Sequence, residues 1–255
     1  MIGCGIDIGS RATKIVLFDA DQKKIRSRVI ADTQLHNDTL INELMDKSLL
    51  KAQCAQNDIT RVIATGYGRE LVSSVTDTVT EITCHARGVQ YFYPEVRTVI
   101  EIGGQDSKIT KLNDDRKIKD FAMNDRCAAG TGRFLEVAIQ LLDIDIADVK
   151  ELIAQSTPAA ISSTCVVFAE SEIIGLLSQK VNRGDIIAGV QKAIASRVMG
   201  LSGRKLVDPV VFTGGVALIP GMDDALAKEC SCSIRVSEFP QYTGALGAAI
   251  IATED

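Results

Sequence analysis

Apolar and polar positions divide the chain into short strand-like runs and longer helical segments. Apolar β-branched runs predict strands at residues 2–8, 12–18, 25–31, 61–65, 97–103, 107–112, 117–123, 210–213 and 233–237. Apolar residues at helical spacing predict helices at residues 39–56, 81–92, 129–142, 148–154, 185–206 and 244–252, and another that opens after Cys165. Strand triplets followed by helices occur twice, which is typical of an α/β protein with two domains.

A short block occurs at the start of each half. Residues 7–15 read DIGSRATKI and residues 101–109 read EIGGQDSKI, at an offset of 94 residues (101 minus 7) without a gap. In each copy an acid stands at the end of an apolar strand, glycine forms the turn, and a second strand follows. Glycine lets backbone N–H groups approach phosphate, while hydroxyl groups of Ser10, Thr13 and Ser107 can join them and the acids can hold Mg²⁺. One Gly-Ser turn is usually only a turn, but a duplicated one predicts two hairpins that grip a nucleotide from both sides.

A third glycine-rich element reads VVFTGGVA at residues 210–217. Taken alone, it fits an ordinary strand-to-helix turn equally well. Beside two phosphate hairpins, the bare backbone at Gly214 and Gly215 can lie against a purine and its ribose. We therefore expect an adenosine contact there.

Composition limits the partners and the location. With 46% hydrophobic residues in 255, the chain can bury one large core or two modest ones, and the repeat favours two. The net charge of −5 and the lack of a dense Lys/Arg tract argue against nucleic acid. No apolar run reaches the ~18 residues of a membrane span, and the first residues enter a strand without a basic leader. We expect a soluble, cytoplasmic protein without membrane association.

The seven cysteines, an odd number, are expected to be reduced thiols rather than a disulfide framework. Cys127 and Cys165 each stand immediately before a predicted helix, where the helix dipole and unpaired N–H groups stabilise a thiolate. They are candidate metal ligands or nucleophiles, and a pair of ordinary buried cysteines is the alternative. The other five are expected to be structural: Cys4 in a strand, Cys54 and Cys84 on helices, and Cys230 and Cys232 in a strand.

The order of these elements resembles the superfamily of actin, the Hsp70 ATPase domain and the sugar kinases. Within it, the chain resembles the activators of 2-hydroxyacyl-CoA dehydratases, in the BadF/BadG/BcrA/BcrD ATPase family, over essentially its whole length. The strings that carry this likeness are ATGYGR at 64–69, IGGQD at 102–106, NDRCAAGTGRF at 124–134, STC at 163–165, FAESE at 168–172, and residues 189–197. The string NDRCAAGTG is the most specific, since sugar kinases have no counterpart.

The resemblance implies a fold and a domain arrangement. The fold is α/β, with two duplicated actin-like (ribonuclease H-like) domains and a nucleotide cleft between them. The expected boundaries are residues 1–93 plus 241–255 for domain I and residues 94–240 for domain II, which carries Cys127 and Cys165. Two positions depart from the family pattern: Glu101 stands where Asp is more frequent, and Arg11 stands where Thr is common.

The resemblance also implies a set of site residues. The expected catalytic residues are Asp7, Glu101, Gln105 and Asp106, which with Lys14 would serve Mg²⁺, phosphate and the attacking water in an unassigned order. The expected ATP/ADP-binding residues are Ser10, Arg11, Ala12, Thr13, Lys14, Gly103, Gly104, Gln105, Gly130, Thr131, Gly132, Gly214, Gly215, Val216 and Gln241. The expected metal ligands are Asp7 for Mg²⁺ and, from each of two chains, Cys127 and Cys165 for one [4Fe–4S] cluster per homodimer.

The function implied by this family is ATP-driven electron transfer. An oxygen-sensitive homodimer would take a low-potential electron from ferredoxin or flavodoxin and pass it to an iron–sulfur dehydratase or another double-cluster acceptor. The alternative is a small-molecule kinase of the same superfamily, similar to an N-acetylglucosamine kinase. Such a kinase needs a sugar pocket and a base, and has no use for paired cysteines at helix starts.

Overall fold

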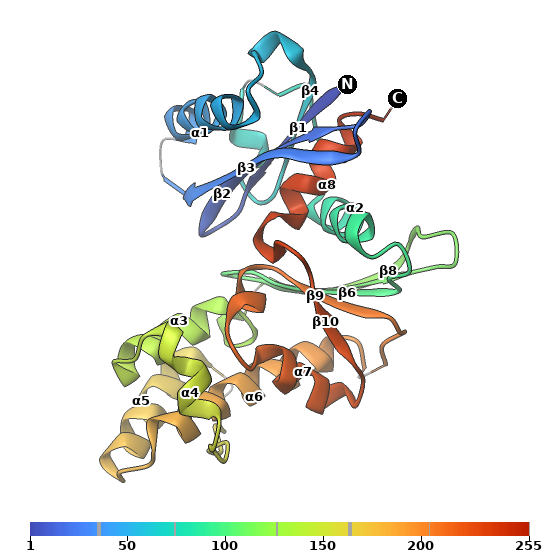
Figure 1. Ribbon diagram of the computed structural model, residues 1–255. Coiled ribbons are helices and arrows are strands. Elements are labelled where there is room, and N and C mark those ends of the chain that lie inside the picture. The colour runs from blue at the N-terminus through green and yellow to red at the C-terminus, as the bar shows by residue number, and fades with distance from the viewer. Residues whose placement is uncertain (35–36, 74, 126, 163–164, 204, 255) are drawn as a thin grey trace. The chain divides into compact units, whose positions relative to one another are not determined.

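Two five-stranded sheets organise the chain, one in each of two units (Figure 1). The computed structural model describes residues 1–255 except 35–36, 74, 126, 163–164, 204 and 255. Three residues of the family strings, Arg126, Ser163 and Thr164, therefore lie outside the described residues. Unit 1 comprises Met1–Glu95 and Glu238–Asp255, and unit 2 comprises Val96–Ser237.

Unit 1 is built around strand β1, which pairs antiparallel with β2 and parallel with β4. Its sheet has the order β3-β2-β1-β4-β5, with β1 (Ile2–Ile8), β2 (Ala12–Asp19), β3 (Lys24–Asp32), β4 (Ile59–Thr65) and β5 (Asp77–Thr78). Its helices are α1 (Asn37–Ala52), α2 (Glu81–Phe92) and α8 (Thr243–Ile251). Side chains alternate along β2: Ile15 and Leu17 pack in the cluster that contains α1, whereas Val16 and Phe18 pack with α8. The sheet is therefore covered on both faces.

Helices α2 and α8 cross at close range because glycines face main-chain oxygens. A Cβ on Gly88 would lie 1.9 Å from the carbonyl oxygen of Thr243, and a Cβ on Gly247 would lie 1.8 Å from that of Cys84. Any side chain at either position would push the helices apart. Helix α8 therefore completes the core of unit 1, where Figure 1 shows it beside β1 and α2.

Unit 2 repeats the same strand arrangement. Its sheet has the order β10-β9-β6-β7-β8, with β6 (Thr98–Ile102), β7 (Ser107–Leu112), β8 (Ile118–Asn124), β9 (Val210–Thr213) and β10 (Ile234–Val236). Its helices are α3 (Gly132–Leu142), α4 (Val149–Ile153), α5 (Val166–Ser178), α6 (Arg183–Leu201) and α7 (Met222–Cys230). As in unit 1, the first strand pairs antiparallel with the second and parallel with the strand that follows the helices.

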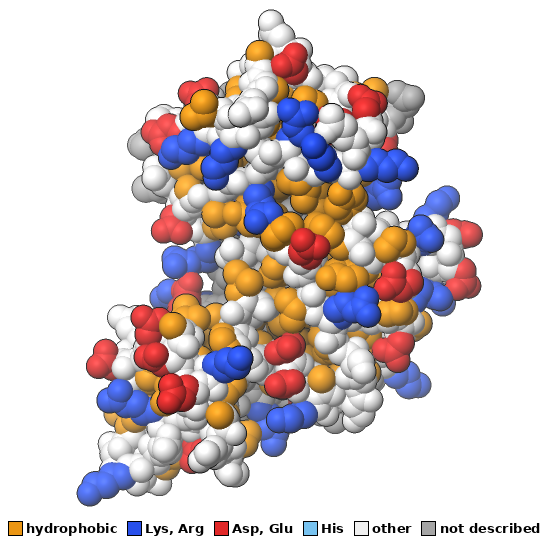
Figure 2. All heavy atoms as spheres, in the orientation of Figure 1, with side chains coloured by type: hydrophobic (Ala, Val, Ile, Leu, Met, Phe, Trp, Pro, Cys, Tyr) orange, Lys and Arg blue, Asp and Glu red, His pale blue; other side chains and the backbone are white. Residues whose placement is uncertain are grey.

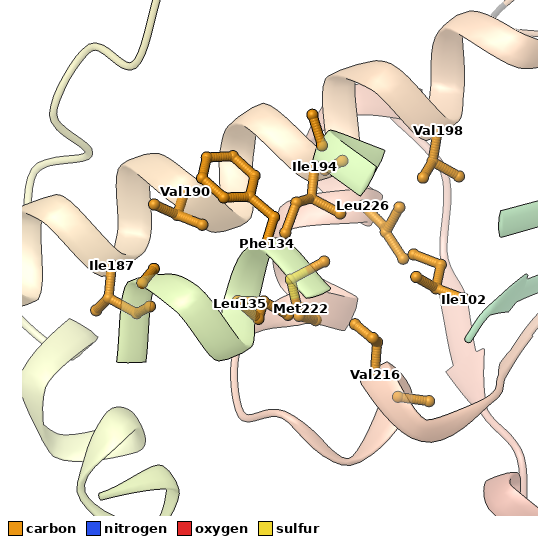
Figure 3. Close-up of a cluster of buried hydrophobic side chains, with 14 of the residues drawn as sticks. Ile102, Phe134, Leu135, Ile187, Val190, Ile194, Val198, Val216, Met222 and Leu226 are labelled. Carbon is orange, nitrogen blue, oxygen red and sulfur yellow. The ribbon is translucent and has the colours of Figure 1, made fainter. Parts of the chain in front are cut away.

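The core of unit 2 lies between α3, α6 and the sheet (Figure 3). Helix α6 contributes Ile187, Val190, Ile194 and Val198, which recur at helical spacing and line one side of the cluster. Phe134 of α3 is fully buried against them. This packing holds α3 rigidly over the strands that carry the second hairpin.

Several sequence-based expectations require correction. Helix α1 ends at Ala52, so Cys54 follows a helix instead of lying on one, and α6 ends at Leu201 rather than residue 206. Helix α7 and the short strand β5 were not expected. Helix α3 starts at Gly132, after a separate 3₁₀ turn over Ala128–Gly130.

The expectation for Cys230 and Cys232 is also wrong. Cys230 is the last residue of α7 and forms a disulfide with Cys232, so these two cysteines are neither strand residues nor free thiols. The physical reason is the left-handed backbone of Ser231 (φ 53°, ψ 38°), which reverses the chain at the helix end. The two Cα atoms come within 5.3 Å, a normal separation for a disulfide.

Charged side chains of both signs lie on the surface. Figure 2 shows acidic and basic side chains interspersed on the visible face of each unit. None of the helices in the described part of the chain has the length and apolar character required to cross a bilayer.

Candidate nucleotide site and exposed cysteine pair

The first hairpin joins β1 to β2 and carries an ion pair. Asp7 lies opposite Lys14 in the strand register, and the Lys14 Nζ lies 3.1 Å from the Asp7 Oδ2. The turn is closed by the N–H of Gly9, which donates to the carbonyl of Ala12 at 3.0 Å. The Asp7 side chain is only 6% exposed, so its orientation is set by the protein and not by solvent.

The second hairpin has the same construction at the expected offset. Glu101 lies opposite Lys108, and the N–H of Gly103 donates to the carbonyl of Asp106 at 3.0 Å. Lys108 Nζ lies 3.0 Å from Glu101 Oε2 and 2.5 Å from Asp106 Oδ2. All three charged groups are buried. Lys108 was not among the expected site residues, although its match with Lys14 in the repeat was a signal that could have identified it.

The start of α3 is bound to the turn of the second hairpin. The N–H groups of Gly132 and Arg133 donate to the carbonyls of Gly103 and Gly104, both at 2.9 Å. In a trans peptide the N–H of the next residue points opposite to the carbonyl. The N–H groups of Gly104 and Gln105 are thus directed away from α3, which is the orientation that an anion outside the turn requires. The Gln105 side chain is exposed at the tip.

A Thr-Gly turn follows the parallel neighbour strand in each unit. Gly214 has a φ of +90°, and a Cβ there would lie 2.4 Å from the carbonyl oxygen of Ile102. Gly66 has a φ of +87°, and a Cβ there would lie 2.5 Å from the carbonyl oxygen of Ile8 and 2.6 Å from the Asp7 carboxylate. Only glycine accommodates both the backbone conformation and the contact. Gly66 was missed as a site residue, although Thr-Gly occurs in both strings.

Three of the expected segments of unit 2 meet at Gly132. A Cβ on Gly132 would lie 2.9 Å from the Gly103 carbonyl oxygen, 3.4 Å from the Gly104 Cα and 3.1 Å from the Val216 Cγ2. The hairpin, the loop that precedes α3 and the turn after β9 are therefore in contact. Gly130 and Thr131 are buried in that loop, and Gly215 is exposed.

The first residues of α8 reach the acid of the first hairpin. A Cβ on Gly244 would lie 3.0 Å from Asp7 Oδ2 and 3.1 Å from His85 Nε2. His85 Nδ1 lies 2.8 Å from the Thr243 hydroxyl. Gln241 lies in the preceding 3₁₀ turn, Pro240–Tyr242. His85 was not expected near Asp7, because its 158-residue separation from Thr243 leaves no local pattern.

The hydroxyl and turn residues of the two hairpins differ in their exposure and in their hydrogen bonds. Arg11 is exposed, and its carbonyl accepts from the N–H of Thr33 at 3.0 Å, while Ser10 and Ala12 are half-buried in the same turn. The Thr13 hydroxyl is buried 3.1 Å from that of Thr33. The Ser107 hydroxyl is fully buried and has no hydrogen-bond partner among the described residues.

Cys127 and Cys165 are both exposed cysteines of unit 2 outside the disulfide, and each directly precedes helical backbone. Cys165 is the N-terminal cap residue of the 13-residue helix α5. Cys127 precedes only the 3₁₀ turn, which corrects the expectation that it starts a long helix. Within the described part of one chain, no group of three or more His, Cys, Asp and Glu could hold a metal ion.

The cysteines of the unit 1 core have a different environment. Burial raises the pKa of the Cys4 thiol and that of the Cys84 thiol to about 12. Burial also raises the pKa of Cys54, which lies just past α1. These thiols remain protonated at neutral pH, as suits small apolar side chains.

We expect alkylation to separate the two kinds of cysteine. Native, cluster-free protein treated with iodoacetamide at about pH 8 should be modified at Cys127 and Cys165 but not at Cys4 or Cys84, because only an accessible thiolate reacts. Peptide mass spectrometry measures this, with urea-unfolded protein as the control in which all four react. Rapid modification of Cys84 in the native protein would contradict the burial described above.

Known proteins resemble the chain along its whole length. The family model described as the BadF/BadG/BcrA/BcrD ATPase family matches residues 4–252. The 2-hydroxyisocaproyl-CoA dehydratase activator of Clostridioides difficile is 41% identical over 257 residues, covering 100% of this chain and 96% of that protein. The (R)-2-hydroxyglutaryl-CoA dehydratase activating ATPase of Acidaminococcus fermentans is 44% identical over 253 residues, covering 97% and 95%.

A solved structure gives the same result for the fold. The activator of the 2-hydroxyisocaproyl-CoA dehydratase from Clostridium difficile with bound ADPNP matches with a TM-score of 0.92 and 41% identity, covering 99% of this chain and 94% of that one. This likeness and the two five-stranded sheets confirm the expected fold class of two duplicated actin-like α/β domains. The resemblance noted from the sequence strings is likewise confirmed, and the chain belongs to the BadF/BadG/BcrA/BcrD ATPase family.

Proposed function

We propose that this protein is an ATP-hydrolysing iron–sulfur electron-transfer protein that activates a 2-hydroxyacyl-CoA dehydratase or a related double-cluster enzyme. The observation that carries the proposal is the pair of exposed cysteines, Cys127 and Cys165, for which ATP hydrolysis alone has no use. Relatives with 41% and 44% identity over nearly the whole chain are named as dehydratase activators. The domain boundaries that we propose remain residues 1–93 plus 241–255 and residues 94–240.

The nucleotide would be held by the glycine turns of both units. Backbone N–H groups at Gly104 and Gln105 would donate to phosphate oxygens, and the turn at Ser10 and Arg11 would do the same in unit 1. The turn at Gly214 would contact adenosine. The remaining proposed nucleotide contacts are Ala12, Thr13, Lys14, Gly103, Gly130, Thr131, Gly132, Gly215, Val216 and Gln241.

The buried charges would orient the reacting groups. Asp7 would hold Mg²⁺, which neutralises phosphate charge when bound. Lys108 bridges Glu101 and Asp106 and so fixes both carboxylates. Those carboxylates, with Gln105, would orient the attacking water. The extra methylene of Glu101 relative to Asp is accommodated by its contact with Lys108.

The cysteines would serve electron transfer in a homodimer. Cys127 and Cys165 from each of two chains would hold one [4Fe–4S] cluster, which supplies one-electron chemistry at low potential when bound. Cys165 is the N-terminal cap residue of α5, so its side chain lies at the start of that helix. Because each cysteine is exposed, each would be reachable by oxygen, by a ferredoxin or flavodoxin donor and by the acceptor protein. ATP hydrolysis would make the transfer directional.

The alternative, a small-molecule kinase similar to N-acetylglucosamine kinases, would use the same glycine turns. It gives no role to the exposed cysteines, and the relatives with more than 40% identity reported above carry activator names. The activator proposal is therefore favoured.

Anaerobic purification tests the proposal. Protein reconstituted with iron and sulfide should be brown, contain one cluster per two chains, and transfer electrons to an acceptor dehydratase only with ATP present. ADP in place of ATP is the control. A colourless protein that binds no iron but phosphorylates an amino sugar would favour the kinase instead.

A further inference from the structure

The side chain of Asn124, the last residue of β8, holds the backbone of Cys127 by two hydrogen bonds. Its Nδ2 donates to the Cys127 carbonyl at 2.8 Å, and its Oδ1 accepts from the Cys127 N–H at 3.0 Å. One carboxamide therefore restrains the peptide groups on both sides of the Cys127 Cα. That restraint sets the direction of the Cα–Cβ bond, from which the sulfur extends.

The same asparagine is attached to the second phosphate hairpin. Asn124 lies opposite Ser107 in the β7–β8 ladder, and Ser107 is the first residue after the hairpin turn. A Cβ on Gly130 would lie 3.1 Å from Asn124 Nδ2 and 3.7 Å from the Ser107 hydroxyl, so the loop passes directly over this pair.

The far end of the Cys127 loop is attached to the hairpin as well. Gly132 and Arg133, which follow the loop, donate their N–H groups to the carbonyls of the hairpin turn at 2.9 Å. The loop from Cys127 to Thr131 is thus fixed to the hairpin at both ends: through Asn124 at one and through the start of α3 at the other. A shift of the turn must move both attachments.

We propose that Asn124 is a positioning residue. It transmits a displacement of the second hairpin turn to the side chain of Cys127. The inference rests on the proposed function for the identity of the groups it links, nucleotide phosphate and cluster ligand. The link itself is a property of the cluster-free chain, so it is measurable whether or not a cluster binds.

Backbone hydrogen exchange in the cluster-free protein tests the link. In Asn124→Ala, the Cys127 amide should exchange about 2- to 12-fold faster than in the wild type, the factor expected for one ordinary hydrogen bond. Asn124→Asp keeps the oxygen that accepts from this N–H but loses the donor to the Cys127 carbonyl, so its exchange should lie between that of the wild type and that of Asn124→Ala. Unchanged exchange at Cys127 in Asn124→Ala would overturn the proposal.

Asn113 offers a matched control at the opposite end of the same two strands. Its Oδ1 accepts from the N–H of Lys117 at 2.9 Å, the same kind of bond in the β7–β8 turn. Asn113→Ala should speed exchange at Lys117 and leave Cys127 unchanged. Equal acceleration at Cys127 in both variants would show general loosening of the strands and would count against a specific role.

The effect of the bound nucleotide on exchange at Cys127 distinguishes transmission through Asn124 from a purely local packing role. In the wild type, exchange at Cys127 should differ between the ADP and ADPNP complexes. In Asn124→Ala this difference should shrink, while calorimetry gives unchanged affinity for ADP and circular dichroism shows a cooperative transition that is lower by a few degrees only. A wild type without any difference, or a variant that keeps all of it, would refute transmission through Asn124.

The reconstituted protein provides a spectroscopic readout. Asn124→Ala should load iron but show an altered electron paramagnetic resonance spectrum and a shifted reduction potential, because one thiolate is held less firmly. A spectrum and potential identical to those of the wild type would contradict the role. Failure of the wild type itself to load iron would refute the proposed function, whereas the exchange experiments would still decide the role of Asn124.

Discussion

Lys108→Met should lower the free energy of unfolding by about 3–5 kcal/mol, because it leaves two buried carboxylates without their cation. The Lys108 side chain is 3% exposed and lies within 3.0 Å of both Glu101 and Asp106. Methionine fills a similar volume, so the loss of stability would come from the missing charge and not from a cavity. Urea denaturation followed by circular dichroism measures it. The deficit should shrink in acid, since a protonated carboxyl group costs less to bury than a carboxylate.

Lys14→Met is the matched control in unit 1. Lys14 faces a single acid at 3.1 Å, and its side chain is 14% exposed, so water can partly replace it. The loss of stability should be clearly smaller than for Lys108→Met. Equal losses of stability would mean that the second acid, Asp106, does not add to the cost of removing the buried cation.

Replacing Cys127 or Cys165 with Ser should abolish cluster binding, because each substitution removes two of the four thiolates from a dimer. Nucleotide binding should survive, since neither side chain is among the proposed nucleotide contacts. Iron analysis after anaerobic reconstitution and calorimetry with ADP measure the two properties separately.

Cys54→Ser is the control for the cysteine variants, because Cys54 lies in unit 1 beside the end of α1. Its iron content should equal that of the wild type. A Cys127→Ser protein that still holds a full cluster per two chains would show that the ligand assignment is wrong.

The repeat made much of the fold predictable. The offset of 94 residues predicted two hairpins of one design, and both strand pairs have the equivalent register, Asp7 with Lys14 and Glu101 with Lys108. Helix α2 and strands β1, β7 and β9 have the expected bounds. Such elements are predictable because each carries its own periodicity or glycine punctuation within a few residues.

Contacts between distant segments were not predictable. No local pattern joins Gly132 to Gly103 or His85 to Thr243, since these contacts depend on how helices pack on the sheet. Helix α7 was missed because its nine residues are too few to establish a helical period; only Met222 and Leu226 of them are buried. The disulfide that follows it depends on one left-handed residue, Ser231, which a C-x-C spacing does not reveal.

The discontinuity of unit 1 has a consequence for the order of events during synthesis. Unit 2 is one uninterrupted stretch, whereas unit 1 lacks α8 until residues 243–251 have been translated. Val16 and Phe18, which pack with α8 in the finished protein, lack that contact on the nascent chain for that time. We therefore expect the usual N-terminal-first order of domain folding to be reversed. The second unit would complete its core first, and the first unit would become complete only when α8 emerges from the ribosome.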